Sequence, residues 1–121
     1  MGLDLKIKSR KIQDIPVLDL EGEIDVYTYP ALNDALLALI KDGNAVITVN
    51  MENVSYIDST GLGVLANGIN KLSEKKGELR VVCAQPNLIK IFTVSGLLNR
   101  NLKIFNAESE AFGVKKTKTV K

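Results

Sequence analysis

Hydrophobic and polar residues alternate along the first part of the chain. Leu3, Leu5 and Ile7 are separated by charged residues, which is the period of two expected of a strand with one buried face. A polar stretch then leads into a second alternating run, residues 17–21, which ends at Gly22. The two runs predict a β-hairpin.

The spacing of apolar residues becomes helical after this hairpin. Within residues 28–40 they recur at three- and four-residue intervals. Pro30 stands near the start of this segment and Gly43 just past its end, which are the positions where these residues punctuate a helix. The same spacing predicts a second helix over residues 59–76, closed by Gly77.

The remaining segments alternate between strands and helices. Residues 45–49 form a short, β-branched and almost continuously apolar run, which is typical of a strand buried on both faces at the centre of a sheet. A loop around Asn53 is predicted between this strand and the second helix. Four further elements are predicted: a strand at 79–82, a helix from Pro86 to Ser95, a strand at 102–105 and a short helix from Ser109. This order predicts one α/β domain, with a mixed sheet of four to five strands that is parallel after the hairpin and packed against α-helices.

Length and composition support a single folded domain. A chain of 121 residues, 45% hydrophobic and 25% charged, can bury one core and is too short for two. No apolar run approaches the ~20 residues that a bilayer requires, and the amino terminus lacks a signal segment, so we expect a cytoplasmic protein without membrane association. The only cysteine, Cys83, follows two valines in a predicted strand, which favours a small core residue over a reactive thiol.

Charge is unevenly distributed along the chain. The net charge is +2, but residues 115–121 hold four of the 16 basic residues and none of the 14 acidic ones, which leaves the body at 12 minus 14, or −2. A nucleic-acid surface would need a concentrated basic face on the folded part, so we expect no direct nucleic-acid partner. Residues 115–121 are predicted to form a basic, disordered tail.

The residue types present exclude most catalytic sites. The chain has no histidine, which removes Ser-His-Asp and Cys-His catalysis and the usual imidazole metal sites. Residues 61–66 match the dinucleotide-binding pattern G-x-G-x-x-A, but they lie within the predicted second helix and not in a loop after the first strand, so close helix packing explains the glycines better. We therefore expect no enzyme, no catalytic residue, no metal and no cofactor.

One hydroxyl at the start of the second predicted helix carries two interpretations. Ser59 stands where a capping residue belongs, with Asp58 before it and Gly61 two residues after. A phosphate on Ser59 would face the free amides and the positive end of the helix dipole, so the fold could accept it. On the residues alone both interpretations stay open, and capping is the commoner use of such a serine.

Two segments resemble the signature segments of a known family. The first is Leu-Glu-Gly-Glu-Ile-Asp at residues 20–25, followed by Thr28; the second is Val-Ser-Tyr-Ile-Asp-Ser-Thr-Gly-Leu-Gly at residues 54–63. Both look like those of STAS domains, and more narrowly of bacterial anti-sigma factor antagonists. The similarity in element order covers about residues 3–112, and it implies a single STAS-like domain over residues 1–114.

The resemblance implies a phosphorylation switch. In this family the antagonist binds an anti-sigma factor that is also a serine kinase, which releases a sigma factor for transcription. The kinase phosphorylates the serine after the aspartate and breaks the complex, and a PP2C-type phosphatase restores it. Matching positions make Ser59 the phosphoacceptor, with Thr60 as a minor alternative.

The resemblance also implies a partner-binding surface and leaves alternatives. The implied surface comprises Asp25, Thr28, Asp58, Ser59, Thr60 and Gly61. A related alternative is a STAS scaffold or transporter-associated subunit that binds another protein and is never phosphorylated. A small hydrolase using Asp58 and Ser59 is disfavoured, because no base is positioned by a motif.

Two positions depart from the family pattern. The residue that closes the central strand, often aspartate in the family, is Asn50 here, and Met51 replaces a common leucine. We expect Asn50 to remove a charge near the phosphorylation site, which would bear on the choice of partner more than on the fold.

Overall fold

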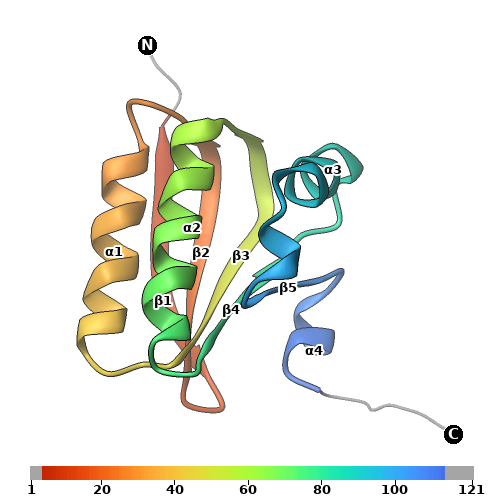
Figure 1. Ribbon diagram of the computed structural model, residues 1–121. Coiled ribbons are helices and arrows are strands. Elements are labelled where there is room, and N and C mark those ends of the chain that lie inside the picture. The colour runs from red at the N-terminus through yellow and green to blue at the C-terminus, as the bar shows by residue number, and fades with distance from the viewer. Residues whose placement is uncertain (1–3, 114–121) are drawn as a thin grey trace, which may run out of the picture.

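The computed structural model describes residues 4–113, which form one mixed sheet covered mainly on one face by helices. Figure 1 shows α1 and α2 side by side in front of the sheet, with the amino-terminal ends of both at the top of the view. The elements in chain order are β1 (Leu5–Ile12), β2 (Ile15–Ile24), α1 (Tyr29–Lys41), β3 (Val46–Ile57), α2 (Ser59–Ser73), β4 (Glu78–Val82), α3 (Pro86–Ser95), a 3-10 helix (Leu97–Asn99), β5 (Leu102–Phe105) and α4 (Glu108–Ala111). The predicted basic tail at 115–121 lies outside the described residues.

The topology follows the predicted alternation of strands and helices. The five strands pair in sequence order, β1 antiparallel to β2 and the other pairs parallel. Each parallel connection carries a helix, and right-handed crossovers between successive neighbours place α1, α2 and α3 on the same face. The predicted hairpin, the parallel sheet and the central position of β3 are confirmed.

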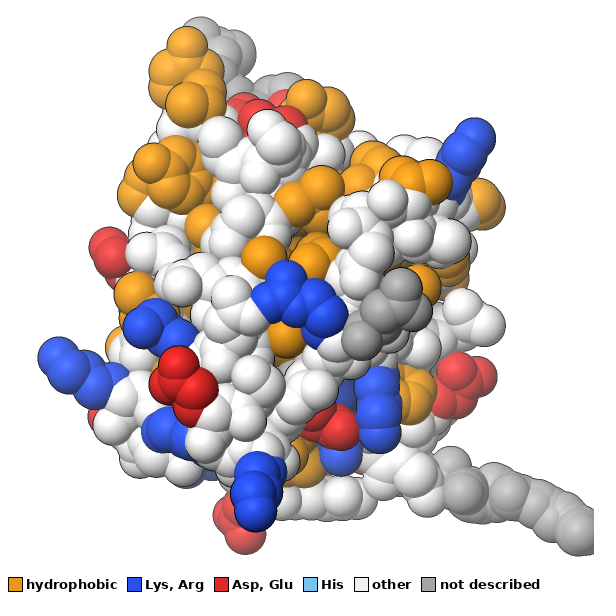
Figure 2. Space-filling view, in the orientation of Figure 1, with side chains coloured by type: hydrophobic (Ala, Val, Ile, Leu, Met, Phe, Trp, Pro, Cys, Tyr) orange, Lys and Arg blue, Asp and Glu red, His pale blue; other side chains and the backbone are white. Residues whose placement is uncertain are grey.

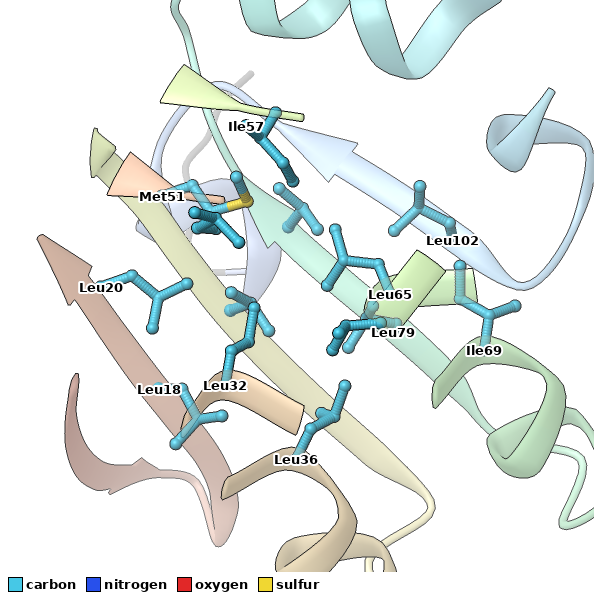
Figure 3. Close-up of a cluster of buried hydrophobic side chains, with 14 of the residues drawn as sticks. Leu18, Leu20, Leu32, Leu36, Met51, Ile57, Leu65, Ile69, Leu79 and Leu102 are labelled. Carbon is cyan, nitrogen blue, oxygen red and sulfur yellow. The ribbon is translucent and has the colours of Figure 1, made fainter. Parts of the chain in front are cut away.

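The core lies between the sheet and these helices. Figure 3 shows side chains from both layers pointing toward one another. The labelled residues, all nearly inaccessible to solvent, are Leu18, Leu20, Leu32, Leu36, Met51, Ile57, Leu65, Ile69, Leu79 and Leu102. A smaller cluster on the opposite face joins Val17 and Val82 to Ala111 and Phe112, so α4 covers only part of that face.

The first two strands are longer than the alternating runs that predicted them. β1 continues through the polar residues up to Ile12, and Pro16, expected before the second strand, lies within β2 opposite Lys11. Pairing between β2 and β3 begins only at Val17, so Pro16 has a strand on one side alone and its missing N–H is tolerated there. Gly22, expected to end the strand, sits inside it with φ of +124°.

The central strand differs most from its prediction. Residues 45–49 were expected to form it, with a loop around Asn53, whereas β3 runs to Ile57 and pairs with β2 from Thr48 to that end. The predicted loop is wrong because β2 supplies a hydrogen-bonding partner for this polar stretch across two register shifts. The longer β3 leads directly into α2.

The other elements agree with the predictions to within a few residues. Helix α2 ends at Ser73, three residues before the predicted end, and a tight turn brings Gly77 against Ala45. Cys83 is fully buried, and burial raises the pKa of its thiol, so the prediction of a core residue is confirmed. Within residues 4–113, no helix is both long and apolar enough to cross a membrane.

Candidate functional site

The two signature segments meet at the carboxyl ends of β2 and β3. The backbone N–H of Asp58, directly after β3, donates to the carbonyl of Ile24 at the end of β2, at 3.1 Å. Helix α2 begins at the next residue, and the loop that leads into α1 follows Ile24. The predicted site residues of both segments therefore lie at one end of the sheet.

Asp58 caps the amino terminus of α2. Its backbone is extended, and its Oδ1 accepts hydrogen bonds from the N–H groups of Thr60 (2.9 Å) and Gly61 (3.2 Å). The prediction that Ser59 is the capping residue is wrong. Aspartate and serine are both good caps, and the extended conformation falls on Asp58, which leaves Ser59 as the first helical residue.

The two neighbouring hydroxyls of the site differ in their bonding. Thr60 Oγ1 donates a short hydrogen bond to Asp58 Oδ1, and this bond, more than the two backbone amides, lowers the pKa of Asp58. Ser59 is exposed, and no atom of residues 4–113 forms a hydrogen bond with its hydroxyl. Of these two hydroxyls, that of Thr60 is bound within the cap, whereas that of Ser59 is exposed to solvent.

The N–H groups of Thr60, Gly61 and Leu62, at the start of α2, are already occupied. Asp58 accepts from two of them through its side chain, and its carbonyl accepts from Leu62 N–H. The expectation that a phosphate on Ser59 would meet free amides is therefore wrong for Thr60 and Gly61. While Asp58 keeps these two donors, the phosphate would extend into solvent beside the Asp58 carboxylate.

Asp25 and Thr28 organise the loop between β2 and α1. Oδ1 of Asp25 accepts from the N–H groups of Tyr27 (2.9 Å) and Thr28 (3.1 Å), which forms an Asx turn. Thr28 Oγ1 donates to the carbonyl of Glu23 at 2.8 Å and accepts from the Asp25 N–H at 2.9 Å. The side chains of these two predicted surface residues therefore hold the loop in place.

Gly61 joins the two segments through its missing side chain. A Cβ at this position would lie 2.6 Å from Ile24 Cγ2 and 2.7 Å from Ile57 Cγ1, so the predicted close packing is confirmed here. Gly63 has no such contact, and the same explanation is wrong for it. It borders an open hollow of about 350 Å³ between α1 and α2, lined by Tyr29, Asn33, Thr60, Gly63, Val64 and Asn67.

Exposed apolar side chains surround the site, and sequence reasoning missed them. Val26, Tyr27 and Tyr56 are 54%, 87% and 47% exposed. Figure 2 shows hydrophobic side chains on either side of acidic ones at the top of the molecule, where α1 and α2 begin. In the sequence, Val26 and Tyr27 stand in the loop before α1 and belong to no apolar periodicity. This was the only feature that could have indicated an exposed apolar surface. Exposed aromatic groups of this kind are typical of protein-binding surfaces.

Comparison with known proteins identifies the family. The STAS domain model matches residues 6–111. The chain belongs to the STAS domain family. It is 35% identical over 95 residues to the anti-sigma-B factor antagonist of Staphylococcus aureus, covering 78% of this chain and 88% of that protein. The anti-sigma-B factor antagonist of Listeria monocytogenes is 34% identical over 114 residues, 93% of this chain and 97% of that protein.

A solved structure shares the STAS fold. The crystal structure of an anti-sigma factor antagonist from Mycobacterium paratuberculosis matches with a TM-score of 0.81 at 25% identity, over 89% of this chain and 91% of that one. The family suggested by the two signature segments and the α/β fold with a mixed sheet are both confirmed.

Asn50, one departure from the STAS pattern, lies away from Ser59. Its Nδ2 donates to Glu52 (3.2 Å) and to Glu108 of α4 (3.0 Å), on the face opposite α1 and α2. Arg10 also binds Glu108 and forms two hydrogen bonds with Asp19. Asn50 lies within β3 instead of closing it, and its amide helps to hold α4 against the sheet. Because this contact is on the face opposite α1 and α2, the expectation that Asn50 removes a charge near the phosphorylation site is wrong.

Proposed function

We propose that this STAS domain is an anti-sigma factor antagonist controlled by phosphorylation of Ser59. The unmodified form binds an anti-sigma factor that is also a serine kinase, and so releases a sigma factor. The kinase then modifies Ser59 and breaks the complex, and a PP2C-type phosphatase reverses the modification. The names of the relatives from S. aureus and L. monocytogenes support the antagonist function.

The observation that best supports this proposal is that the Ser59 hydroxyl is exposed and takes no part in capping the helix. Its hydroxyl is exposed at the first residue of α2, while Asp58 beside it performs the capping. A kinase can therefore reach the oxygen of Ser59, and the modification removes no hydrogen bond that holds the helix. The hydroxyl of Thr60 is half-buried and bound to Asp58, which disfavours it as the alternative acceptor.

Binding would use the surface around this serine. Asp25, Thr28, Asp58, Ser59 and Thr60 form its polar part, and Val26, Tyr27 and Tyr56 supply exposed apolar area. Gly61, which the resemblance also assigned to this surface, is buried against Ile24 and Ile57 and would support the surface from below. A phosphate adds a charge of about −1.5 to −2 beside the Asp58 carboxylate. Repulsion, desolvation and bulk would then oppose a partner fitted to a neutral hydroxyl.

The test is a phosphorylation assay with matched variants. The protein is incubated with ATP and candidate serine kinases from its own cell, and the intact mass and the modified peptide are read. Ser59→Ala should not be labelled, whereas Thr60→Val should be labelled on Ser59. Because Asp58 is the cap, Ser59→Ala should remain within about 0.5 kcal/mol of wild type in unfolding free energy.

Calorimetric titration against the kinase completes the test. Unmodified protein and Ser59→Ala should bind alike, and the phosphorylated protein should bind at least tenfold more weakly. If the phosphorylated protein binds as tightly as the unmodified one, the switch is wrong and an unphosphorylated STAS scaffold becomes the better assignment. Labelling of Ser59→Ala at the wild-type rate would transfer the role to Thr60.

A further inference from the structure

The second half of β3 has a strand on one side only. β4 pairs with residues 46–50, whereas β2 pairs with β3 from Thr48 to Ile57. Among the described residues, no strand therefore continues the ladder on the β4 side after Asn50. Backbone carbonyls in this half of β3 need other donors, because a polar backbone group left unpaired away from water is destabilising.

One side chain supplies these donors. Nε2 of Gln85, in the connection between β4 and α3, donates to the carbonyl oxygens of Met51 (3.0 Å), Glu52 (3.0 Å) and Val54 (2.9 Å). A carboxamide nitrogen has two hydrogens, so the three oxygens share them. The Gln85 side chain replaces the missing strand along this stretch.

The other end of the same carboxamide is also fixed. Oε1 of Gln85 accepts from the N–H of Ala84 at 3.1 Å and from the thiol of Cys83 at 3.3 Å. With the carboxamide in this orientation, its NH₂ group faces the β3 carbonyls and its oxygen faces the Cys83 thiol and the Ala84 N–H. The reversed orientation would place an oxygen against carbonyls and N–H groups against donors. Both ends of the side chain are therefore used, and Cys83 anchors it from the core.

Gln85 holds β3 at the point where the strand is irregular. Between Asn50 and Asn53, β3 has two residues where β2 has one, and a second extra residue, Ser55, follows Val54. Such bulges bend a strand and change the direction of the chain beyond them. The neighbouring carbonyls of Met51 and Glu52 both reach Gln85, which a regular strand with alternating carbonyls would not allow.

We propose that Gln85 is a positioning residue for Ser59. By binding the bulged carbonyls of β3 it fixes the bend that directs Ile57 and Asp58 toward the end of β2, where the Asp58 N–H meets the Ile24 carbonyl. The orientation of Ser59 at the start of α2 depends on this bend. The functional consequence rests on the proposed role of Ser59, whereas the structural part needs no partner.

A matched pair of substitutions tests the structural part. Gln85→Glu keeps the size and the acceptor of the side chain and removes its donors. Asn101→Asp makes the same chemical change at the far end of β4, where Asn101 Nδ2 donates to the Gly77 carbonyl at 2.8 Å. Gln85→Met, which removes donors without adding charge, separates lost hydrogen bonds from repulsion.

Amide hydrogen exchange and amide NMR spectra provide the measurement. In both Gln85 variants the amides of residues 54–58 should exchange at least about tenfold faster, a change of about 1.4 kcal/mol in opening free energy, with resonances of residues 58–61 displaced. Amides of α1 should remain at their wild-type rates. Asn101→Asp should leave the site amides unchanged. Equal acceleration throughout the domain, or unchanged site amides, would overturn the positioning role.

Phosphorylation kinetics connect the position of Ser59 to its use. With a kinase that labels the wild type, the Gln85 variants should show a reduced rate and weaker binding, and Asn101→Asp should match wild type. Wild-type kinetics despite faster exchange would overturn the functional part. If no kinase labels the wild type, the proposed function fails, and the exchange data still decide whether Gln85 holds β3.

Discussion

Adding one methyl group at Gly61 tests how α2 is seated on the sheet. The new Cβ would lie 2.6 Å from Ile24 Cγ2 and 2.7 Å from Ile57 Cγ1, closer than carbon atoms approach without displacement. Both isoleucines are buried, at 0% and 2% exposure, so neither can rotate into solvent. Gly63, two residues further along the same helix, has no heavy atom within 4 Å of its Cβ position apart from its chain neighbours and the adjacent backbone of its own helix, so it provides the control.

The magnitudes come from two opposing effects. Replacing glycine by alanine inside a helix gains about 1 kcal/mol at either position. Overpacking a buried contact costs about 1–3 kcal/mol, and it applies to Gly61 alone. Gly63→Ala should therefore be more stable than wild type by up to about 1 kcal/mol. The sum for Gly61→Ala runs from neutral to about 2 kcal/mol less stable.

Urea denaturation of the two variants and the wild type measures the difference. Gly63→Ala should have the higher urea midpoint, and its free energy of unfolding should exceed that of Gly61→Ala by about 1–3 kcal/mol, with equal m values. Equal m values show that the same surface is exposed on unfolding. If Gly61→Ala is as stable as Gly63→Ala, the close approach of α2 to Ile24 and Ile57 is wrong, and the helix start is not fixed as described.

Three further changes address other residues. Asp25→Asn keeps the Oδ1 that accepts from Thr28, so its unfolding free energy should stay within about 0.5 kcal/mol of wild type while calorimetric affinity for the kinase falls. Asn50→Asp sets a further carboxylate against Glu108; exchange of α4 amides should accelerate, and unchanged rates would contradict the contact. The pKa of Asp58 is lowered in the fold, so its ionised carboxylate stabilises the folded state above the usual aspartate pKa, and this stabilisation is lost as the pH falls. At pH 6 the urea midpoint of wild type should exceed that of Asp58→Asn, and the two midpoints should converge below about pH 4.

The sequence predicted the elements whose pattern is local. The first helix was recognised because apolar residues repeat at helical spacing between Pro30 and Gly43, and α1 begins and ends where these residues indicate. The first hairpin, the later strands and α3 were predicted by the same logic. Fold class and topology then depend on the order of elements, since right-handed crossovers leave few arrangements.

The extension of β3 could not be predicted in this way. Glu52 and Asn53 are polar neighbours that interrupt the alternation, and this stretch is strand only because β2 pairs with Asn50 and Asn53 on either side of a bulge. The partner comes from a distant part of the sequence, so a local pattern does not contain it. The same holds for Asn50, whose position near the end of an apolar run suggested a strand end, whereas its side chain faces α4.

The site was located from the sequence, but its internal roles were not. Asp58 and Ser59 both have side chains that cap helices, and composition cannot choose between them. The choice depends on which residue has the extended backbone, and in the structure this is Asp58, whose N–H bonds to Ile24 at the end of β2. The residue that caps the helix is thus also the one bonded to a strand distant in the sequence, which a local pattern does not contain.

This division of roles bears on the proposed phosphorylation of Ser59. A capping serine uses its oxygen to bind amides of the first turn, so a phosphate there would disturb the helix that presents it. Here Asp58 binds those amides and the Thr60 hydroxyl, and the Ser59 oxygen forms no bond within residues 4–113. A change at Ser59 can therefore alter the charge seen by a partner while the cap, and with it the fold, is preserved.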